Sequence, residues 1–213
     1  VEILAAERLI ERSRVDEAAV VGQSRAARAQ SEGVYAEEIT SVELKSRRGT
    51  KVIEHDENLR PETNLDVLSQ LPPLYGGVVT AGNSCGLNDA GAAVVMTTRD
   101  VAADRGLDAI GHVVSWANVG VDPKMMGLGP VAATTKALEA AELTLDDIDI
   151  IELNDSFTVQ ALAVEDELGL DPEKVNVNGG AIALGHPMGA TGTRLVLSAL
   201  SELRRRGGGR AVW

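Results

Sequence analysis

The sequence predicts an α/β fold, and three observations indicate it. Hydrophobic residues make up 44% of the 213 residues but aromatic residues only 2%, so the core must consist of Ala, Val, Leu and Ile. The 22 glycines suit tight turns between strands and helices better than an all-β sandwich. Strand-like and helical patterns also alternate along the chain, which predicts a layered sheet with right-handed crossovers.

The N-terminal part predicts helices followed by a polar excursion. Residues 1–12 begin directly as an amphipathic helix. Ser13 and Asp16 have the spacing of a capping box, in which the acidic side chain reaches back to the Ser13 amide. We therefore expect a helix from this box to about Ser31, ended by Gly33. The next segments predict a half-buried strand over 39–45 and a surface excursion over 46–76 with one short helix at 63–70.

Denser apolar residues begin near Gly76, and strands alternate with helices from there. Pro130 marks the first turn of one helix, and Gly169 and Gly207 end two others. In layered α/β sheets the ligand site lies beyond the strand ends, where this chain has its Gly-rich and Asn-rich turns. The expected elements are strands over 109–120 and 174–180, a stretch over 145–154 that leads into a buried strand, and helices over 129–143, 156–169 and 191–207.

Charge and composition exclude several classes of protein. A formal net charge of −12 opposes general nucleic-acid binding, which needs clustered Lys and Arg. No apolar run reaches the length of a membrane span, and no signal-peptide pattern opens the chain, so we expect no membrane association. A single cysteine cannot form an internal disulfide, which makes the reducing cytoplasm the expected location.

The two ends of the sequence predict a piece of a longer protein. The chain has no initiator Met, and it stops within the first residues of an apolar strand, "RAVW". A natural tail is the alternative interpretation.

The stretch "NVNGGAIALGHPMGATGTR" contains the first candidate for chemistry, His186. Its spacing G-x-x-x-G-x-x-G matches neither a phosphate loop nor a dinucleotide fingerprint. The turn requires glycines for positive φ or close backbone approach: Gly179, Gly180, Gly185, Gly189 and Gly192. The following helix begins near Thr191, and its positive end favours a neutral imidazole, which suits a general base or an oxyanion donor. A structural role in the turn is the alternative.

Two further candidates lie at turns before helices. Asn154 in "ELNDSF" either projects into the same cleft as His186 or caps the next helix, which Asp155 can also help to cap. Cys85 in "AGNSCGLNDAG" is either a nucleophile paired with His186 or a small residue in a crowded turn. Met126 and Phe157 line either a pocket or the core.

The histidine stretch closely resembles the histidine signature of thiolases, the acetyl-CoA acetyltransferase and 3-ketoacyl-CoA thiolase family. Three more segments resemble the family in the same order: "TAGNSCGLNDAGAAVV", "VDPKMMGLGPVAATTKALE" and "ELNDSFTVQALAV". The resemblance implies a layered αβαβα fold, with residues 1–86 forming part of the domain that covers coenzyme A. Residues 87–213 would then form the C-terminal core domain, truncated before its last strand.

The resemblance also implies roles for individual residues. His186 would activate the nucleophilic thiol and help to form an oxyanion hole, and Asn154 would hold the oxyanion-hole water. Met126 and Phe157 would line the pantetheine and acyl pocket, together with Gly185 and Gly189 of the histidine turn. Cys85 stands where the family often has a Ser near coenzyme A, so the resemblance argues against Cys85 as nucleophile.

The resemblance implies ping-pong acyl transfer. The reaction would be thiolysis of a 3-ketoacyl-CoA or the reverse Claisen condensation. Coenzyme A would be a substrate, no metal or bound cofactor would be needed, and a homodimer or homotetramer would form. Both catalytic cysteines of the family would lie outside these residues, which leaves this chain inactive alone. A lipid-carrier-type relative and a non-catalytic acyl-CoA-binding remnant are the alternatives, and Asn154 opposes the first, because those relatives commonly have His there.

Overall fold

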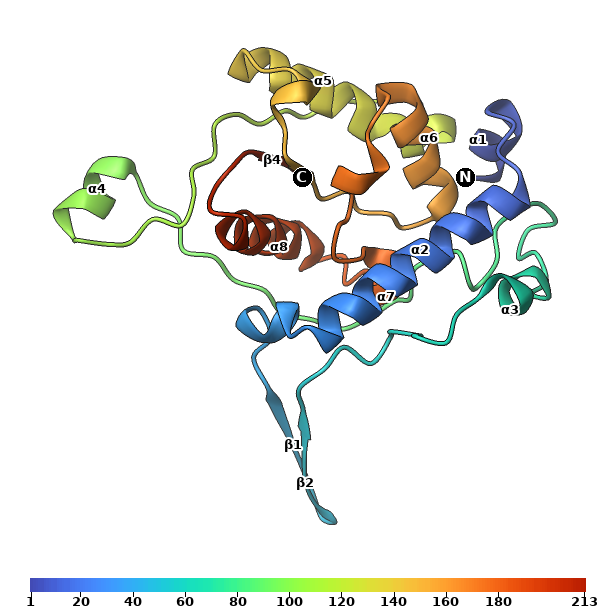
Figure 1. Ribbon diagram of the computed structural model, residues 1–213, viewed down its shortest axis with the longest axis horizontal. Coiled ribbons are helices and arrows are strands. Elements are labelled where there is room, and N and C mark those ends of the chain that lie inside the picture. Colours follow the sequence, from blue (N-terminus) through green and yellow to red (C-terminus); the bar gives the residue numbers. More distant parts are fainter.

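The computed structural model describes residues 1–213, in which helices surround a small parallel sheet (Figure 1). The helices are α1 Glu2–Glu7, α2 Arg12–Ser31, α3 Leu65–Ser69, α4 Arg99–Asp104, α5 Gly129–Ala141, α6 Thr158–Leu168, α7 Ala181–Leu184 and α8 Thr191–Arg205. The strands are β1 Val42–Ser46, β2 Gly49–Ile53, β3 Ile150–Ile151 and β4 Ala211–Val212. Short 3-10 helices are η1 Val34–Glu37, η2 Pro123–Leu128, η3 Leu145–Asp147 and η4 Pro172–Lys174. None of the helices is both long and apolar enough to cross a membrane.

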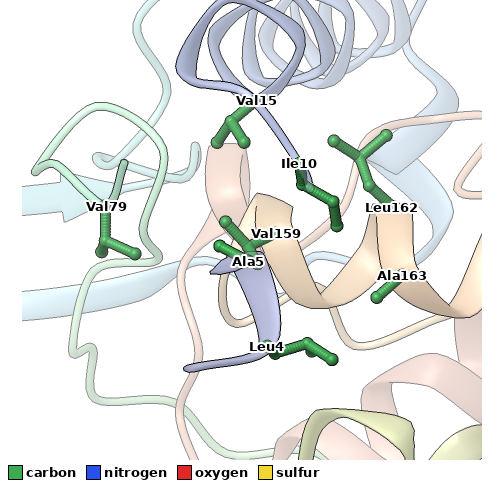
Figure 2. Close-up of a cluster of buried hydrophobic side chains, with 8 residues drawn as sticks. All are labelled: Leu4, Ala5, Ile10, Val15, Val79, Val159, Leu162 and Ala163. Carbon is green, nitrogen blue, oxygen red and sulfur yellow. The ribbon is translucent and has the colours of Figure 1, made fainter. Parts of the chain in front are cut away.

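The core lies on two sides of α6, whose residues 158–164 are all buried. A helix that is buried on every face belongs in an interior rather than at a surface. One side of α6 contacts α1 and α2 in the cluster shown in Figure 2, which consists of Leu4, Ala5, Ile10, Val15, Val79, Val159, Leu162 and Ala163. The other side joins β3 and α5 in a second cluster, which consists of Leu138, Ile148, Ile151, Leu153, Ala161, Val164 and Val175.

The parallel sheet is short because few strands of this chain find neighbours. Strands β3 and β4 pair over two residues each, with Ile150 opposite Ala211. The predicted strand over 174–180 contributes only one bridge, between Val175 and Ile151. The short turn of helix α7 that follows it was not predicted.

Helix α2 holds the irregular backbone that leads to α7. Arg25 donates to the carbonyl oxygens of Pro172 and Val175 at 3.0 and 2.8 Å, and Arg28 donates to that of Val177 at 2.7 Å. These guanidinium groups satisfy carbonyls that no neighbouring strand reaches. The segment before the histidine turn is therefore fixed by a helix rather than by a sheet.

Residues 87–97 and 108–121 are extended and form no backbone–backbone hydrogen bonds. The strand predicted over 109–120 is therefore wrong for this chain, because an extended segment becomes a strand only through a hydrogen-bonded neighbour. Large apolar side chains on these segments are exposed, including Val95 at 95% and Trp116 at 76%. We call these two segments the unpaired segments.

Two predictions in the N-terminal part are also wrong. Helix α2 begins at Arg12 with Glu11 as a cap residue that lacks a side-chain bond, so Ser13 and Asp16 form no capping box. Asp16 is instead buried and accepts from Arg12 Nε at 2.7 Å. Strand β1 is exposed on both faces because it pairs only with β2 in a protruding hairpin (Figure 1).

Several predicted helix boundaries are confirmed. Helix α2 ends at Ser31 before Gly33, which has a φ of 73°. Pro130 lies in the first turn of α5, and Gly169 ends α6 with a φ of 62°. Gly207 follows α8 with a φ of 84°. These positions could be predicted because Pro and Gly act through their own backbone preferences.

Candidate active site

Three segments far apart in the sequence form the site, and Asn83 anchors the first of them. Its fully buried side chain donates to Asp16 Oδ1 at 2.9 Å, and the backbone carbonyl oxygen of Asn83 accepts from the amide of Thr158 at 3.1 Å. The amide of Cys85 donates to the carbonyl oxygen of Ser156 at 3.0 Å. Residues 83–86 therefore lie against the turn that precedes α6.

Asn176 joins the second segment, the turn around Asn154, to the third segment, which leads to His186. Its side-chain Oδ1 accepts from the Leu153 amide at 2.8 Å, and its Nδ2 donates to the Leu153 carbonyl oxygen at 2.9 Å. The side-chain amide thus takes the place of a neighbouring strand and fixes the backbone next to Asn154. Sequence analysis missed this residue, and no signal in the sequence marks it; the structure gives it a positive φ of 46°, which Asn tolerates better than most residues.

Three glycines of the histidine turn are required by contacts within the chain. Gly179 and Gly185 each have a φ of 90°. A Cβ at Gly179 would lie 2.5 Å from the Ala26 Cβ, and one at Gly185 would overlap the Asn88 side chain. A Cβ at Gly180 would overlap the Asp155 carboxyl group. The turn is therefore packed tightly against α2 and against the side chains of Asn88 and Asp155.

The same requirement does not hold for the other two glycines of the turn. A Cβ at Gly189 or at Gly192 would meet no atom of this chain within 4 Å, and neither residue has a positive φ. Nothing within this chain therefore requires Gly at these two positions, and their role in the close approach of a ligand stays a prediction. Both positions are exposed at the start of α8.

His186 and Asn154 are brought together by these segments. The His186 amide donates to the carbonyl oxygen of Gly86 at 2.9 Å, which fixes the backbone that carries the imidazole ring. The ring Nε2 lies 3.5 Å from Asn154 Nδ2, and Nδ1 lies 2.8 Å from Thr191 Oγ1. Both ring nitrogens thus have polar neighbours, and the ring is half-buried.

Asn154 does not cap α6, whose cap residue is Phe157 and which has no side-chain cap. Its Nδ2 donates to Ser156 Oγ at 2.9 Å, while its Oδ1 is buried and has no partner in the chain. A buried polar atom without a partner is costly unless a water or ligand satisfies it. This oxygen therefore marks a place where a bound molecule belongs.

The sequence predicts that Asp155 helps to cap α6, but in the structure it caps α7. Its Oδ1 accepts from the Ala181 amide at 2.5 Å, at the start of α7 rather than of α6. Burial raises the pKa of this carboxyl group to about 7, although the amide hydrogen bonds oppose the shift. Asp155 thereby connects the turn after Asn154 to the turn before His186.

Cys85 lines a cleft of about 570 Å³ beside this cluster, together with Asn58, Arg60, Leu71 and Ile182. Burial raises the pKa of the Cys85 thiol, so its environment favours the protonated form. A reactive cysteine needs the opposite shift. The geometry therefore places Cys85 at a cleft wall without activating it.

Other predicted site residues lie outside the cluster around His186. Phe157 is partly buried and packs against the core cluster of Figure 2, and its backbone bridges to Ser84. Met126 lies in η2 and is 63% exposed, whereas its neighbour Met125 packs against the core. No group of three or more His, Cys, Asp or Glu side chains is arranged to hold a metal ion.

Sequence analysis also missed two ionisable side chains with buried polar atoms behind the site, Glu152 and Arg194. Glu152 is 2% exposed, and burial raises the pKa of its carboxyl group to about 8. Its Oε2 has no partner, and neither do the buried Nε and Nη2 atoms of Arg194 on α8. Glu152 precedes Asn154 by two residues in the apolar run "DIDIIELN", and a charge at that place is the only signal for it.

Comparison with known families matches nearly the whole chain. Residues 1–100 match the thiolase N-terminal domain, and residues 107–213 match the thiolase C-terminal domain. The chain is 46% identical over 199 residues to an acetyl-CoA acetyltransferase of Paracoccus denitrificans, covering 92% of this chain and 51% of that protein. It is 50% identical over 204 residues to the 3-oxoadipyl-CoA/3-oxo-5,6-dehydrosuberyl-CoA thiolase of Escherichia coli, covering 93% of this chain and 51% of that protein.

Solved structures have the same fold over the same region. The acetyl-CoA acetyltransferase of Bacillus anthracis superposes with a TM-score of 0.96 at 40% identity, covering 99% of this chain and 54% of that chain. Human mitochondrial 3-ketoacyl-CoA thiolase in complex with CoA superposes with a TM-score of 0.90 at 39% identity, covering 99% of this chain and 52% of that chain. The chain thus spans about half the length of the relatives that it matches.

Proposed function

The chain belongs to the thiolase family, and from this premise we propose that it supplies the histidine side of an acyl-CoA acyltransferase site. The reaction would be thiolysis of a 3-ketoacyl-CoA, or the reverse Claisen condensation of two acyl-CoA molecules. One observation supports the proposal above the others: His186 Nε2 and Asn154 Nδ2 lie 3.5 Å apart, beside an unpartnered Asn154 Oδ1.

In this mechanism His186 accepts a proton at Nε2 from a cysteine thiol, and the resulting thiolate attacks the 3-keto carbon of the substrate. The C2–C3 bond then breaks, which leaves an acyl-enzyme and releases acetyl-CoA after its C2 carbon is protonated. A thiol of free coenzyme A finally takes the acyl group. The protonated ring donates to the developing oxyanion, and Asn154 holds the water that supports it.

The nucleophilic cysteine of this proposal comes from polypeptide outside these residues. Cys85 is the chain's only cysteine, and the raised pKa of its thiol suits a cleft wall rather than a nucleophile. The cleft that Cys85 lines combines polar Asn58 and Arg60 with apolar Leu71, which suits the alternating amide and alkyl groups of pantetheine. Residues 1–86 would then contribute part of the domain that covers coenzyme A, and Met126 and Phe157 part of the pocket wall.

The remaining half of the fold is also assigned to other polypeptide. The unpaired segments have free backbone donors and acceptors and exposed apolar side chains, as sheet strands without neighbours do. We assign these segments to sheets that the remaining half of a thiolase completes. A homodimer or homotetramer of the complete protein, in the cytoplasm and without a metal, belongs to the same proposal.

A chimera tests the proposed activity. In it, this chain replaces the aligned region of the Escherichia coli relative, which supplies the rest of a thiolase. We expect thiolysis of a 3-ketoacyl-CoA by the chimera, loss of turnover in its His186→Ala variant, and normal turnover in His55→Ala, at an exposed histidine, as a control. This 213-residue chain alone should show no turnover with acetoacetyl-CoA.

Two outcomes would overturn the proposal. A folded chimera that binds coenzyme A but forms no acyl-enzyme would favour the acyl-CoA-binding alternative. Complete loss of acyl-enzyme formation in Cys85→Ser, or turnover by the chain alone that disappears in that variant, would make Cys85 the nucleophile.

A further inference from the structure

Thr191 contacts the Nδ1 edge of the His186 ring, on the side away from Asn154. It is the first residue of α8 and only 4% exposed. Its Oγ1 lies 2.8 Å from His186 Nδ1 and 3.0 Å from the carbonyl oxygen of Pro187. Both distances are within hydrogen-bonding range, so the hydroxyl group has two partners at once.

A count of protons decides which group donates in each contact. The Thr191 hydroxyl has one proton, and the Pro187 carbonyl oxygen can only accept. If the hydroxyl donates to Pro187, its oxygen is free to accept from a proton on His186 Nδ1, and both contacts are hydrogen bonds. If Nδ1 is unprotonated, the hydroxyl proton can go to only one of the two acceptors, and the chain loses one hydrogen bond, although the Pro187 carbonyl oxygen also accepts from the amides of Ala190 and Thr191 at 2.8 and 2.9 Å.

The opposite side of the ring leads independently to the same assignment. The neighbour of His186 Nε2 is Asn154 Nδ2 at 3.5 Å, which is a donor group. A proton on Nε2 would place two donors against each other, whereas an unprotonated Nε2 can accept. This step takes the Asn154 amide in the orientation in which Nδ2 donates to Ser156 Oγ at 2.9 Å.

We propose that Thr191 is a positioning residue that holds neutral His186 with its proton on Nδ1 and leaves Nε2 free as the base. The tautomer of a histidine is set by the hydrogen bond that its other nitrogen makes. The backbone bond from the His186 amide to Gly86 places the ring, and Thr191 then selects the nitrogen that faces the cleft. The catalytic meaning of this arrangement rests on the proposed function, but the tautomer itself does not.

Long-range ¹H–¹⁵N NMR of this chain measures the tautomer directly, because only three histidines have to be assigned. At about pH 9, where imidazole is neutral, we expect wild-type His186 to be protonated on Nδ1. Thr191→Val keeps the shape but removes the acceptor at Nδ1, so the share of the Nε2-protonated form should rise measurably even though Asn154 still faces Nε2. Thr191→Ser should keep the wild-type tautomer, and Thr193→Val on the same helix is the matched control.

The chimera described above provides the catalytic readout. Thr191→Val should lower kcat by about 10–100-fold with little change in KM, because the wrong tautomer cannot accept a proton at Nε2. Thr191→Ser should stay within about threefold of the parent, since its hydroxyl still accepts.

The two measurements separate failure of this inference from failure of the proposed function. An Nδ1-protonated His186 in an inactive chimera would uphold the tautomer and refute the thiolase activity. An Nε2-protonated wild-type His186 would overturn the inference whatever the activity, and would mean that the Asn154 amide is oriented the other way. An unchanged tautomer in folded Thr191→Val would equally show that Thr191 does not set it; if that variant does not fold, the wild-type spectrum alone decides.

Discussion

The turn around His186 and the unpaired segments differ in where their bonding partners lie. In the turn, side chains and backbone from three segments and α2 satisfy one another, and three glycines leave no room for a methyl group. The unpaired segments, residues 87–97 and 108–121, have no backbone–backbone hydrogen bonds and expose Val95 and Trp116. The histidine side of the site is therefore built within this chain, whereas the unpaired segments find no backbone partners in it.

The largest effect should come from the residue at the centre of the self-contained turn. In the chimera, His186→Ala removes a base and an oxyanion donor together. A positioned base is worth about 10²–10⁴ in rate and one oxyanion donor about 10²–10³. Because one residue serves both roles, the effects do not add, and we expect a loss in kcat on the order of 10³–10⁵. His186→Asn should lose somewhat less, since its amide still donates.

Thermal midpoints measured beside kcat separate chemistry from structure at this position. Both variants should keep the parent midpoint within a few degrees, because the glycine turn has its own contacts with α2 and Asp155. Early unfolding of both variants, with normal turnover by the remaining folded enzyme, would show that His186 is structural.

The packing of the turn predicts opposite effects for two glycine substitutions. Gly179→Ala places a methyl group 2.5 Å from Ala26 Cβ at a φ of 90°, and it should destabilise the chain by about 2–4 kcal/mol through strain and overpacking. Gly192→Ala in α8 meets open space and should stabilise the chain by about 0.5–1 kcal/mol, because Gly is a poor helix former.

Urea unfolding of both variants measures the difference. Similar stabilities for Gly179→Ala and Gly192→Ala would contradict the tight contact between the turn and α2. Destabilisation by Gly192→Ala alone would mean that something unseen within this chain approaches that position.

The same contrast explains which features could be predicted from the sequence. Helix ends at Gly33, Gly169 and Gly207 were predicted because each depends on one residue's own backbone preference. Of the two interpretations of Asn154, the one that places its amide beside His186 agrees with the 3.5 Å between the two side chains. Local chemistry was sufficient in these cases.

Features that depend on distant partners could not be predicted in this way. The strand over 109–120 has the right pattern but lacks a neighbour, so periodicity alone gave the wrong result. The Ser13 and Asp16 spacing predicted a capping box, but Arg12 and the buried Asn83 bind Asp16 instead. Asn176, which takes the place of a missing strand, is visible only once the segments are assembled.

The buried carboxyl groups behind the site predict how stability depends on pH. Burial raises the folded-state pKa of Glu152 to about 8 and that of Asp155 to about 7, from ordinary values of 4.5 and 3.8. For Glu152, Arg194 opposes the shift and Glu38 adds to it. The unfolded chain therefore loses these protons first, so the free energy of unfolding should fall as pH rises from about 4 to about 8.

Denaturant titrations at several pH values test this dependence. Each group contributes a slope of at most about 1.4 kcal/mol per pH unit, in the interval between its two pKa values. Glu152→Gln should remove its share of the slope, whereas Glu173→Gln, at an exposed carboxyl group, should not. Stability that instead rises over this interval would mean that both carboxylates are ionised and paired in the folded chain.

The smallest effect should come from the unpaired segments. Trp116 is 76% exposed, so Trp116→Ser removes almost no packing and should change the free energy of unfolding of this chain by less than about 0.5 kcal/mol. Val159→Ala, in the core cluster of Figure 2, should cost about 2 kcal/mol as a matched control, because it leaves a buried cavity. In the chimera, where neighbouring strands would cover residue 116, Trp116→Ser should become as costly as the core substitution or more so. A large loss in the isolated chain would show that residue 116 is already covered, and dependence of that loss on protein concentration would identify a second copy of this chain as the cover. An equally small loss in the active chimera would show that these residues stay exposed, and would refute their assignment to a sheet completed by the rest of a thiolase.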